Sequence, residues 1–196
     1  MYFTHSLAGA LTIKPIIDKQ GKDFTEKEKV ALWFVGITAS VLPDFDLIYV
    51  VLTGVDNHRY FITHGITIYL LMFLIAYLLR YVQEKKEFGR KFFKVLSLVF
   101  ITGVFTHLFF DILLGGIALL SPFSLRIFGF DMYLRKEGVN WLNKYIISKY
   151  MFLEFFIASV FFYTFKHKKY IAAKMFSLMY FVAALVSFVF ISSTMF

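Results

Sequence analysis

The stretch VLSLVFITGVFTHLFFDILLGGIALL, residues 95–120, carries two ionisable side chains, His107 and Asp111. A helix needs about 20 predominantly apolar residues to cross a bilayer, so we expect this run to span a membrane. The whole chain of 196 residues has the same character, with 59% apolar and 17% charged residues and a mean hydropathy of +0.70. Soluble domains are about half apolar and about a quarter charged. The sequence therefore predicts an integral membrane protein.

Basic segments separate further apolar runs along the chain. These runs cover residues 2–17, 30–55, 64–79, 151–165 and 170–196. Of the 21 Lys and Arg residues, 15 lie in the three segments 14–29, 80–94 and 166–174. Cytoplasmic loops carry an excess of Lys and Arg, so we expect these three segments in the cytoplasm and segment 121–150 outside. We predict a single all-α domain, residues 1–196, that forms a polytopic helical bundle of about five to six membrane helices in the inner membrane. The first run either spans the membrane or is re-entrant.

The composition also excludes several kinds of site. The chain has no Cys, which excludes disulfides, thiolate metal ligands and cysteine nucleophiles. The formal net charge of +8 is spread over the loops as topology requires, so we expect no nucleic-acid partner. Membrane lipids are the expected surroundings, and the oligomeric state stays open.

Seven ionisable residues interrupt the apolar runs, and each is costly in a bilayer unless it has a partner or a function. They are His5, Asp44, Asp46, His64, His107, Asp111 and Glu154. A rise of about 1.5 Å per helical residue places five of them between about 13 and 24 Å from the nearest cytoplasmic loop. This shared depth predicts one converging site in the extracytoplasmic half of the membrane.

Two motifs carry most of that site. His107 and Asp111 are four residues apart on one helical face, so both could bind one ion; a His–Asp pair that only locks helix packing is the alternative. In Leu42-Pro43-Asp44-Phe45-Asp46 the proline interrupts the helix, and an irregular turn could present both carboxylates. A capped helix break is the alternative there, and on a regular helix only one of the two Asp residues would be a ligand.

Segment 58–64, HRYFITH, adds further candidates. His64 is a candidate ligand, and Arg59 could hold an anionic phosphate or carboxylate; membrane-rim residues that only reach the interface are the alternative, and for His58 that alternative is favoured. His5 and Glu154 join the site through their depth alone. His167 is expected in a solvated loop.

In this order the motifs resemble those of a bacterial and archaeal family of membrane-bound metal-dependent hydrolases, whose best-known member is an inner-membrane protein under LexA control. The matching segments are Thr4-His5, Leu42 to Asp46, His58 to Gly65, Thr106 to Asp111, Gly115 to Ser124 with its Ser121-Pro122-Phe123-Ser124 ending, and Leu153-Glu154. Segment 58–64 is one residue longer than the family pattern, and Gly65 replaces the usual Ser. The ligand order is also similar to that of bacterial zinc phospholipases C, which implies metal ligands at His5, Asp44, His64, His107 and Asp111.

The resemblance and the donor set lead to one functional hypothesis. Nitrogen and carboxylate ligands suit one to two Zn²⁺ ions, with Mn²⁺ or Fe as options. We expect metal-activated water to cleave a phosphoester or ester bond of a lipid-like substrate, with Asp46 or Glu154 as general base and Arg59 on the substrate's negative charge. Segment 121–150 could gather anionic headgroups or be an ordinary connection. A metal-ion transporter and a metal-stapled structural protein are the alternatives.

Overall fold

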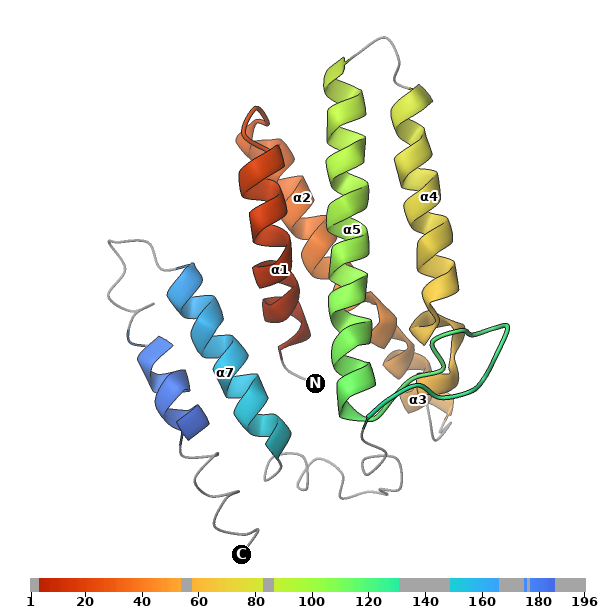
Figure 1. Ribbon diagram of the computed structural model, residues 1–196, viewed down its shortest axis with the longest axis vertical. Coiled ribbons are helices and arrows are strands. Elements are labelled where there is room, and N and C mark those ends of the chain that lie inside the picture. Colours follow the sequence, from red (N-terminus) through yellow and green to blue (C-terminus); the bar gives the residue numbers. More distant parts are fainter. Residues whose placement is uncertain are drawn as a thin grey trace, which may run out of the picture.

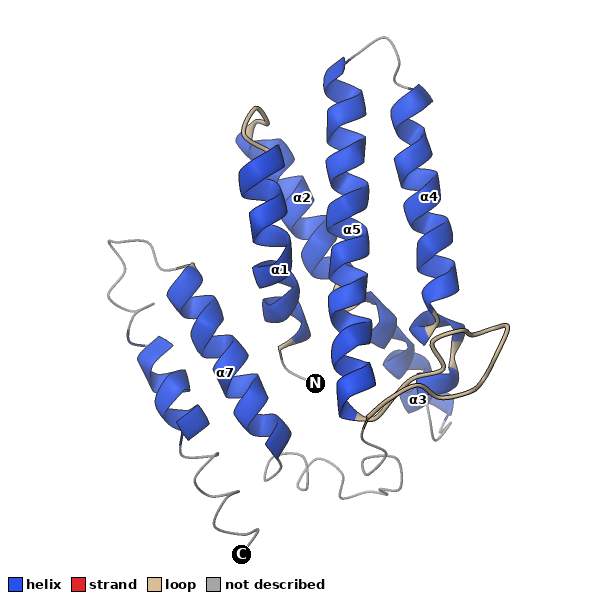
Figure 2. Cartoon of the chain, viewed as in Figure 1, coloured by secondary structure: helices blue, strands red, loops and turns tan. Residues whose placement is uncertain are grey.

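The computed structural model describes residues 4–53, 58–82, 87–130, 149–165, 175 and 177–185. Its helices are α1 (His5–Gln20), α2 (Glu26–Ala39), η1 (Leu42–Asp46), α3 (Leu47–Thr53), η2 (His58–Tyr60), η3 (Ile62–His64), α4 (Ile66–Val82), α5 (Glu87–Leu114) and α7 (Lys149–Thr164). Within these residues no β-strand occurs, and a single bridge joins Ile117 to Phe128 (Figures 1 and 2). The prediction of an all-helical chain is confirmed for this part.

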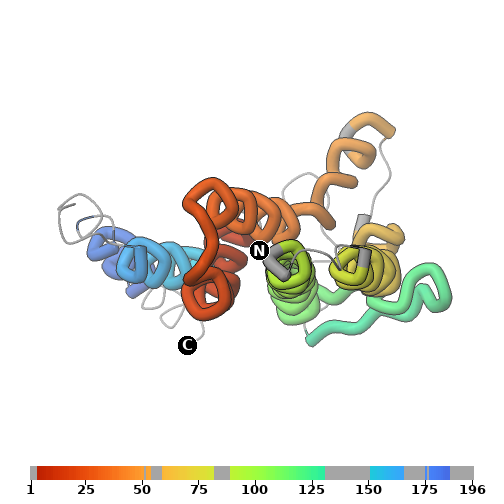
Figure 3. The backbone as a smooth tube through the Cα atoms, turned by 90° about the horizontal axis from the view of Figure 1, so that it is seen from above, coloured from red at the N-terminus to blue at the C-terminus, as the bar shows by residue number. Residues whose placement is uncertain are grey.

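The long helix α5 is the centre of the arrangement. It packs against α4 on one side and against α1 and α2 on the other, while α7 contacts α1 from outside (Figure 1). Seen from above, α7 and α4 therefore lie at opposite sides of the molecule (Figure 3). Val99 of α5 packs with Ile13 and Leu32, and Val104 packs with Ala39 and Tyr69, so the apolar core follows α5 along its length.

Glycines let three of these helices approach closely. A Cβ atom on Gly103 of α5 would lie 2.4 Å from the carbonyl oxygen of Gly36 in α2, and one on Gly9 of α1 would lie 2.3 Å from the Ser40 side chain. Small residues at helix contacts are the usual means of bringing backbones together in membranes. The result is that Ser40, at the end of α2, lies against both α1 and α5.

Membrane-crossing length is shown for one or two of the described helices. Gly89–Leu114 is long and apolar enough, and Glu26–Ala39 with Leu42–Val50 would make a second span if the two, bent by 56°, form one broken helix. Ile66–Tyr81 and Met151–Thr164 are shorter apolar helices. The predicted sixth run, residues 170–196, lies mostly outside the described residues.

A return loop closes the C-terminal end of α5. Gly116 has φ +80°, a conformation that side chains other than glycine rarely adopt, and its N–H donates to the Asp111 carbonyl at 2.8 Å. The loop then donates from Ala118 N–H to the Arg59 carbonyl at 3.0 Å, and Ile66 N–H donates to the Leu119 carbonyl at 2.8 Å. These bonds hold the short helices η2 and η3 against the end of α5, where His107 and Asp111 lie.

Candidate metal centre

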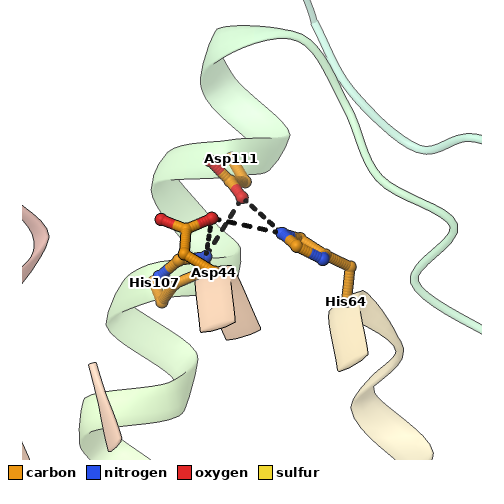
Figure 4. Close-up of side chains that lie close together, drawn as sticks. All are labelled: Asp44, His64, His107 and Asp111. Atoms are coloured by element: carbon orange, nitrogen blue, oxygen red, sulfur yellow. Dashed lines mark ion pairs between the residues drawn. The ribbon is translucent and has the colours of Figure 1, made fainter. Parts of the chain in front are cut away.

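Four side chains from three segments converge beside the C-terminal end of α5. Asp44 comes from η1, His64 from η3, and His107 and Asp111 from α5 (Figure 4). One ligand atom of each lies within 4.8 Å of the others. The predicted convergence of Asp44, His64, His107 and Asp111 is thus found in the structure, and the Pro43 turn is what lets Asp44 reach it, since residues 42–46 form a short 3-10 helix.

The two histidines are oriented by groups behind them. His107 Nδ1 is 2.9 Å from the backbone carbonyl of Ser40, which can only accept, so this nitrogen carries the proton. His64 Nδ1 is 3.1 Å from Oδ2 of Asp46, which calls for the same tautomer. Both rings therefore direct the lone pair of Nε2 towards the carboxylates of Asp44 and Asp111. Carboxylates or carbonyls behind the ring are the usual supports of metal-binding histidines.

The spacing of the four atoms fits a metal ion. His107 Nε2 is 3.2 Å from Asp111 Oδ2 and 3.6 Å from Asp44 Oδ1, and His64 Nε2 is 3.4 Å and 3.5 Å from the same two oxygens. Tetrahedral zinc, with bonds of about 2.0–2.1 Å, places its ligand atoms about 3.4 Å apart. Charge-assisted hydrogen bonds would be shorter, at about 2.7–2.9 Å. The four residues could therefore hold one cation between them.

The fifth predicted ligand, His5, lies on the other side of the same carboxylates. Its Nε2 is 3.6 Å from Asp111 Oδ1 and 4.0 Å from Asp44 Oδ2, and its ring stacks on His107 with centroids 4.0 Å apart. His5 is 2% exposed, and neither ring nitrogen has a hydrogen bond to any described residue. Each carboxylate thus presents one oxygen to the histidine pair and its other oxygen to His5.

A family model now adds to this geometry. The model of the YdjM inner membrane protein family matches residues 1–191. The chain belongs to the YdjM inner membrane protein family. The match confirms a membrane protein and points to the inner membrane, as predicted, while the activity stays a proposal. The comparisons with curated proteins and with solved structures gave no match.

In this YdjM-family chain each of the three residues predicted to be catalytic contacts a ligand residue of the centre or a residue next to one. Asp46 binds His64 Nδ1 and accepts the Thr63 hydroxyl. Arg59, 8% exposed, donates from Nη1 to the carbonyls of Asp111 at 3.3 Å and Gly116 at 3.2 Å, and its Nη2 is 3.6 Å from Asp111 Oδ1.

The third of these residues, Glu154, is buried in α7. Its Oε2 accepts the hydroxyl of Thr4, which immediately precedes His5. Glu154 therefore supports the segment that carries His5. The side chain of His58 lies outside what the structure describes, as does His167.

No supporting role was predicted from the sequence for the threonines next to the histidines or for Ser40. A threonine precedes each of the three histidines, as Thr4-His5, Thr63-His64 and Thr106-His107. The first two donate to Glu154 and Asp46. The repeated Thr-His pair was the available signal for these supporting contacts. The Ser40 carbonyl had no such signal because any residue supplies one.

The centre has one exposed side. The side chain of Asp44 is 21% exposed, whereas those of His64, His107 and Asp111 are at most 3% exposed. Large apolar side chains follow Asp44 along the chain: Phe45, Ile48 and Tyr49 are each more than half exposed. The exposed member of the centre thus stands at the start of an exposed apolar segment.

Proposed function

We propose that this protein is a membrane-embedded metal-dependent hydrolase that cleaves a phosphoester or ester bond of a lipid-like substrate. The observation that carries the proposal is the set of four ligand atoms around one point, with both histidine tautomers fixed from behind. Zn²⁺ suits this donor set, with Mn²⁺ or Fe as options. When bound, such an ion lowers the pKa of its water to about 7 and so supplies hydroxide at neutral pH.

Asp44, His64, His107 and Asp111 hold the principal ion in this proposal. His5 and the outward oxygens of the two carboxylates offer three donors for a second ion. Three protein ligands with a position left for water are typical of catalytic zinc, whereas structural zinc sites are usually closed by four. The four-residue set alone would make a closed site, whereas the three donors at His5 leave a position for water, and this open second set supports catalysis over a purely structural ion.

The remaining polar residues take supporting roles. Asp46 holds His64 in its binding tautomer, and Arg59 both ties Asp111 to the return loop and adds positive charge next to the carboxylates. That charge favours an anionic group such as a phosphoester. Glu154, with Thr4, holds the N-terminal turn of α1, and a proton-accepting role for Asp46 or Glu154 is tested below.

The surroundings of Asp44 favour a lipid-like substrate. The exposed side of the centre adjoins Phe45, Ile48 and Tyr49, and Leu52 one turn later is 78% exposed. An apolar chain can lie on this surface while a polar ester group reaches Asp44. A water-soluble substrate would gain nothing from crossing it.

Transport of the metal is the second candidate, and the packing disfavours it. A pathway from the centre along α5 would need free polar groups, yet Thr106 donates to the Thr102 carbonyl at 2.8 Å and Ser40 to the Ile37 carbonyl at 2.7 Å. Beyond them Gly36 and Gly103 are in backbone contact. The close contact of α2 with α5 in the described residues thus disfavours a transport path towards the basic loops.

We also propose the fuller topology, with five to six membrane helices, the basic loops in the cytoplasm and the metal centre in the outer half. The positive-inside distribution of Lys and Arg supports it. Because the chain has no Cys, a single cysteine at position 86 can be labelled selectively. Labelling from outside intact cells would contradict this topology.

One experiment separates the functional alternatives. Detergent-purified protein is analysed for bound metal and screened with a chromogenic phosphodiester and mixed lipids plus added zinc or manganese, in parallel with metal uptake into proteoliposomes. We expect metal-dependent hydrolysis that His107→Ala abolishes together with the bound metal, and that Arg59→Gln lowers with the metal retained. Exposed Asp18→Asn is the matched control.

The other outcomes identify the alternatives. Saturable metal flux without hydrolysis of any substrate would mean that the protein is a transporter. Bound metal with neither hydrolysis nor flux, combined with unfolding when the metal is removed, would mean that the ion is structural.

A further inference from the structure

The other end of the α4–α5 pair carries a second polar site of opposite sign. A cavity of about 530 Å³ lies there, lined by Arg80, Tyr81, Arg90, Lys91 and Lys94. Arg90 and Asp111 are 21 residues apart on α5, so about 30 Å separates the cavity from the metal centre. The cavity is thus distinct from the site described above.

Among the described residues, a carboxylate pairs with one of the cations that line the cavity. Lys91 forms an ion pair with Asp23 in the loop between α1 and α2. Among the described residues, no carboxylate lies within ion-pair distance of Arg80, Arg90 or Lys94. Three cations that share one hollow attract an anion, and they repel each other until one binds.

Arg80 is already held in place for such an anion. Its guanidinium lies over the Tyr77 ring at 3.6 Å and the Tyr81 ring at 4.4 Å, and it donates from Nη2 to the Tyr81 hydroxyl. Stacking fixes the plane of the guanidinium, whose remaining N–H groups form the fork that matches a phosphate. A preorganised arginine loses little further side-chain entropy when it binds.

The outer face of α4 indicates that this phosphate belongs to a lipid. Leu71, Leu74, Ile75 and Leu78 on the turns before Arg80 are each 47–58% exposed. Tyr81, which lines the cavity and is 50% exposed, follows Leu78 by three residues on this side of α4, so acyl chains can lie along the helix while the headgroup enters among the basic residues. Basic pockets between membrane helices on the cytoplasmic side are typical binding places for anionic headgroups.

We propose that the basic cavity between the ends of α4 and α5 binds the phosphate headgroup of an anionic phospholipid. The chemistry recognised is a phosphodiester anion, which the stacked Arg80 holds together with Arg90 and Lys94. Each basic residue near an anionic lipid contributes roughly fivefold in affinity, so removal of all three should cost about 100-fold.

The test compares two triple variants with the same loss of charge. Arg80→Gln/Arg90→Gln/Lys94→Gln removes three cations from the cavity, whereas Lys19→Gln/Lys22→Gln/Lys27→Gln removes three cations from the α1–α2 region. Binding of dioleoylphosphatidylglycerol, dioleoylphosphatidylcholine and inorganic phosphate to the detergent-purified full chain is measured by native mass spectrometry and titration. Thermal unfolding confirms that both variants are folded.

We expect phosphatidylglycerol to bind at least about tenfold more tightly than phosphatidylcholine or phosphate, the cavity variant to lose this preference, and the control variant to stay within about twofold of the wild type. Arg80→Lys, which keeps the charge and loses the stacked fork, should bind several-fold more weakly than the wild type. Equal losses in both triple variants, or equal affinity for both lipids, would overturn the proposal. Inorganic phosphate that binds as tightly as phosphatidylglycerol would overturn its lipid part.

Discussion

At its C-terminal end α5 places His107 and Asp111 among buried carboxylates and imidazoles, whereas at its N-terminal end it places Arg90, Lys91 and Lys94 around an open basic cavity. At the first end Ser40 and Asp46 hold the Nδ1 atoms of His107 and His64, and Arg59 donates to the Asp111 carbonyl. At the second end the basic side chains have a single carboxylate partner among the described residues, Asp23.

This difference follows from burial. A buried charge without a partner is strongly unfavourable, so each charged group at the buried end needs an oppositely charged or hydrogen-bonding neighbour. The distances at this end suit a small cation with short bonds. The basic end stays close to water, where unpaired cations cost little and can adapt to a larger anion. We therefore expect substitutions at the buried end to act in an all-or-none manner, and those at the basic end to act in small steps.

The largest effect is expected for the histidines of the metal centre. His107→Ala or His64→Ala removes a ligand of the four-residue set, so the purified protein should lose its bound metal. His5→Ala should remove at most one ion and leave the principal one, because His5 contacts only the outward carboxylate oxygens. Metal analysis after dialysis gives the stoichiometry.

The comparison of His5→Ala with the His64→Ala and His107→Ala variants also tells whether the centre binds one ion or two. Unchanged metal content in His5→Ala would show that a single ion occupies the centre. A complete loss in that variant would show that His5 is a ligand of the principal ion. Lipid binding at the basic end should be the same in all three variants.

A substitution between the two ends should have the next largest effect. In Gly103→Leu the new side chain would meet the Gly36 carbonyl, since even its Cβ would lie 2.4 Å from that oxygen, and the backbone cannot yield cheaply. Overpacking typically costs about 1–3 kcal/mol, so we expect the midpoint of thermal unfolding to fall by about 5 °C or more. Metal affinity should fall as well because α2 carries Ser40.

Phe105→Leu on the exposed face of α5 is the control for this substitution. It changes the volume of a side chain on the same helix without altering the contact with α2. If Gly103→Leu unfolds at the wild-type temperature, the close approach of α2 and α5 is not what sets the position of the metal centre.

The spacing of residues in the sequence predicted the ligands of the metal centre. It did not predict the supporting contacts, which come from residues distant in the sequence. The four-residue interval of His107 and Asp111 and the proline before Asp44 suffice for their convergence. The division of labour between Asp44 and Asp46 could not be predicted, because it depends on how η3 is held by the return loop after Gly116.

The apolar runs predicted that the chain is helical, but they did not determine the number of helices that cross the membrane. Composition identifies a helical membrane chain, yet Pro43 divides the second run into α2, η1 and α3 with a bend of 56°. At the basic end the Lys and Arg residues indicate only topology in the sequence. The stacking of Arg80 between Tyr77 and Tyr81 appears only once α4 is formed, since residues 77 and 81 lie one turn apart on the same side.

A smaller effect is expected for Asp46→Asn. The amide keeps the shape of the side chain and weakens the acceptor behind His64, and such losses behind a metal-binding histidine typically cost about 10–100-fold in metal affinity. Stoichiometry at saturating metal should stay that of the wild type. Competition with a chelator measures the affinity, and Asp18→Asn controls for the loss of one carboxylate.

The same variant tests the role of Asp46 in hydrolysis. Hydrolysis restored by excess metal supports a positioning role. Hydrolysis lost at full metal occupancy would assign Asp46 as the general base, and in that case the corresponding measurement on Glu154→Gln should show little change.

The smallest effect is expected at the basic end, where Asp23 pairs with Lys91. The Lys91 ammonium holds the pKa of the Asp23 carboxyl below its usual value of 3.8. A lowered pKa in the folded state means that the pair contributes to stability above pH 3.8, and that this contribution is lost as the pH falls through the folded-state pKa. Both groups are exposed and screened, so Asp23→Asn should lower the unfolding midpoint at neutral pH by less than about 2 °C. The difference should vanish in about 0.5 M salt. In Asp23→Asn the Lys91 side chain becomes free to face the cavity, so phosphatidylglycerol should bind as tightly as before or slightly more tightly. If the unfolding midpoint of Asp23→Asn falls as far as that expected for Gly103→Leu, the basic end is as closely determined by its partners as the buried end. The contrast between the two ends of α5 would then not hold.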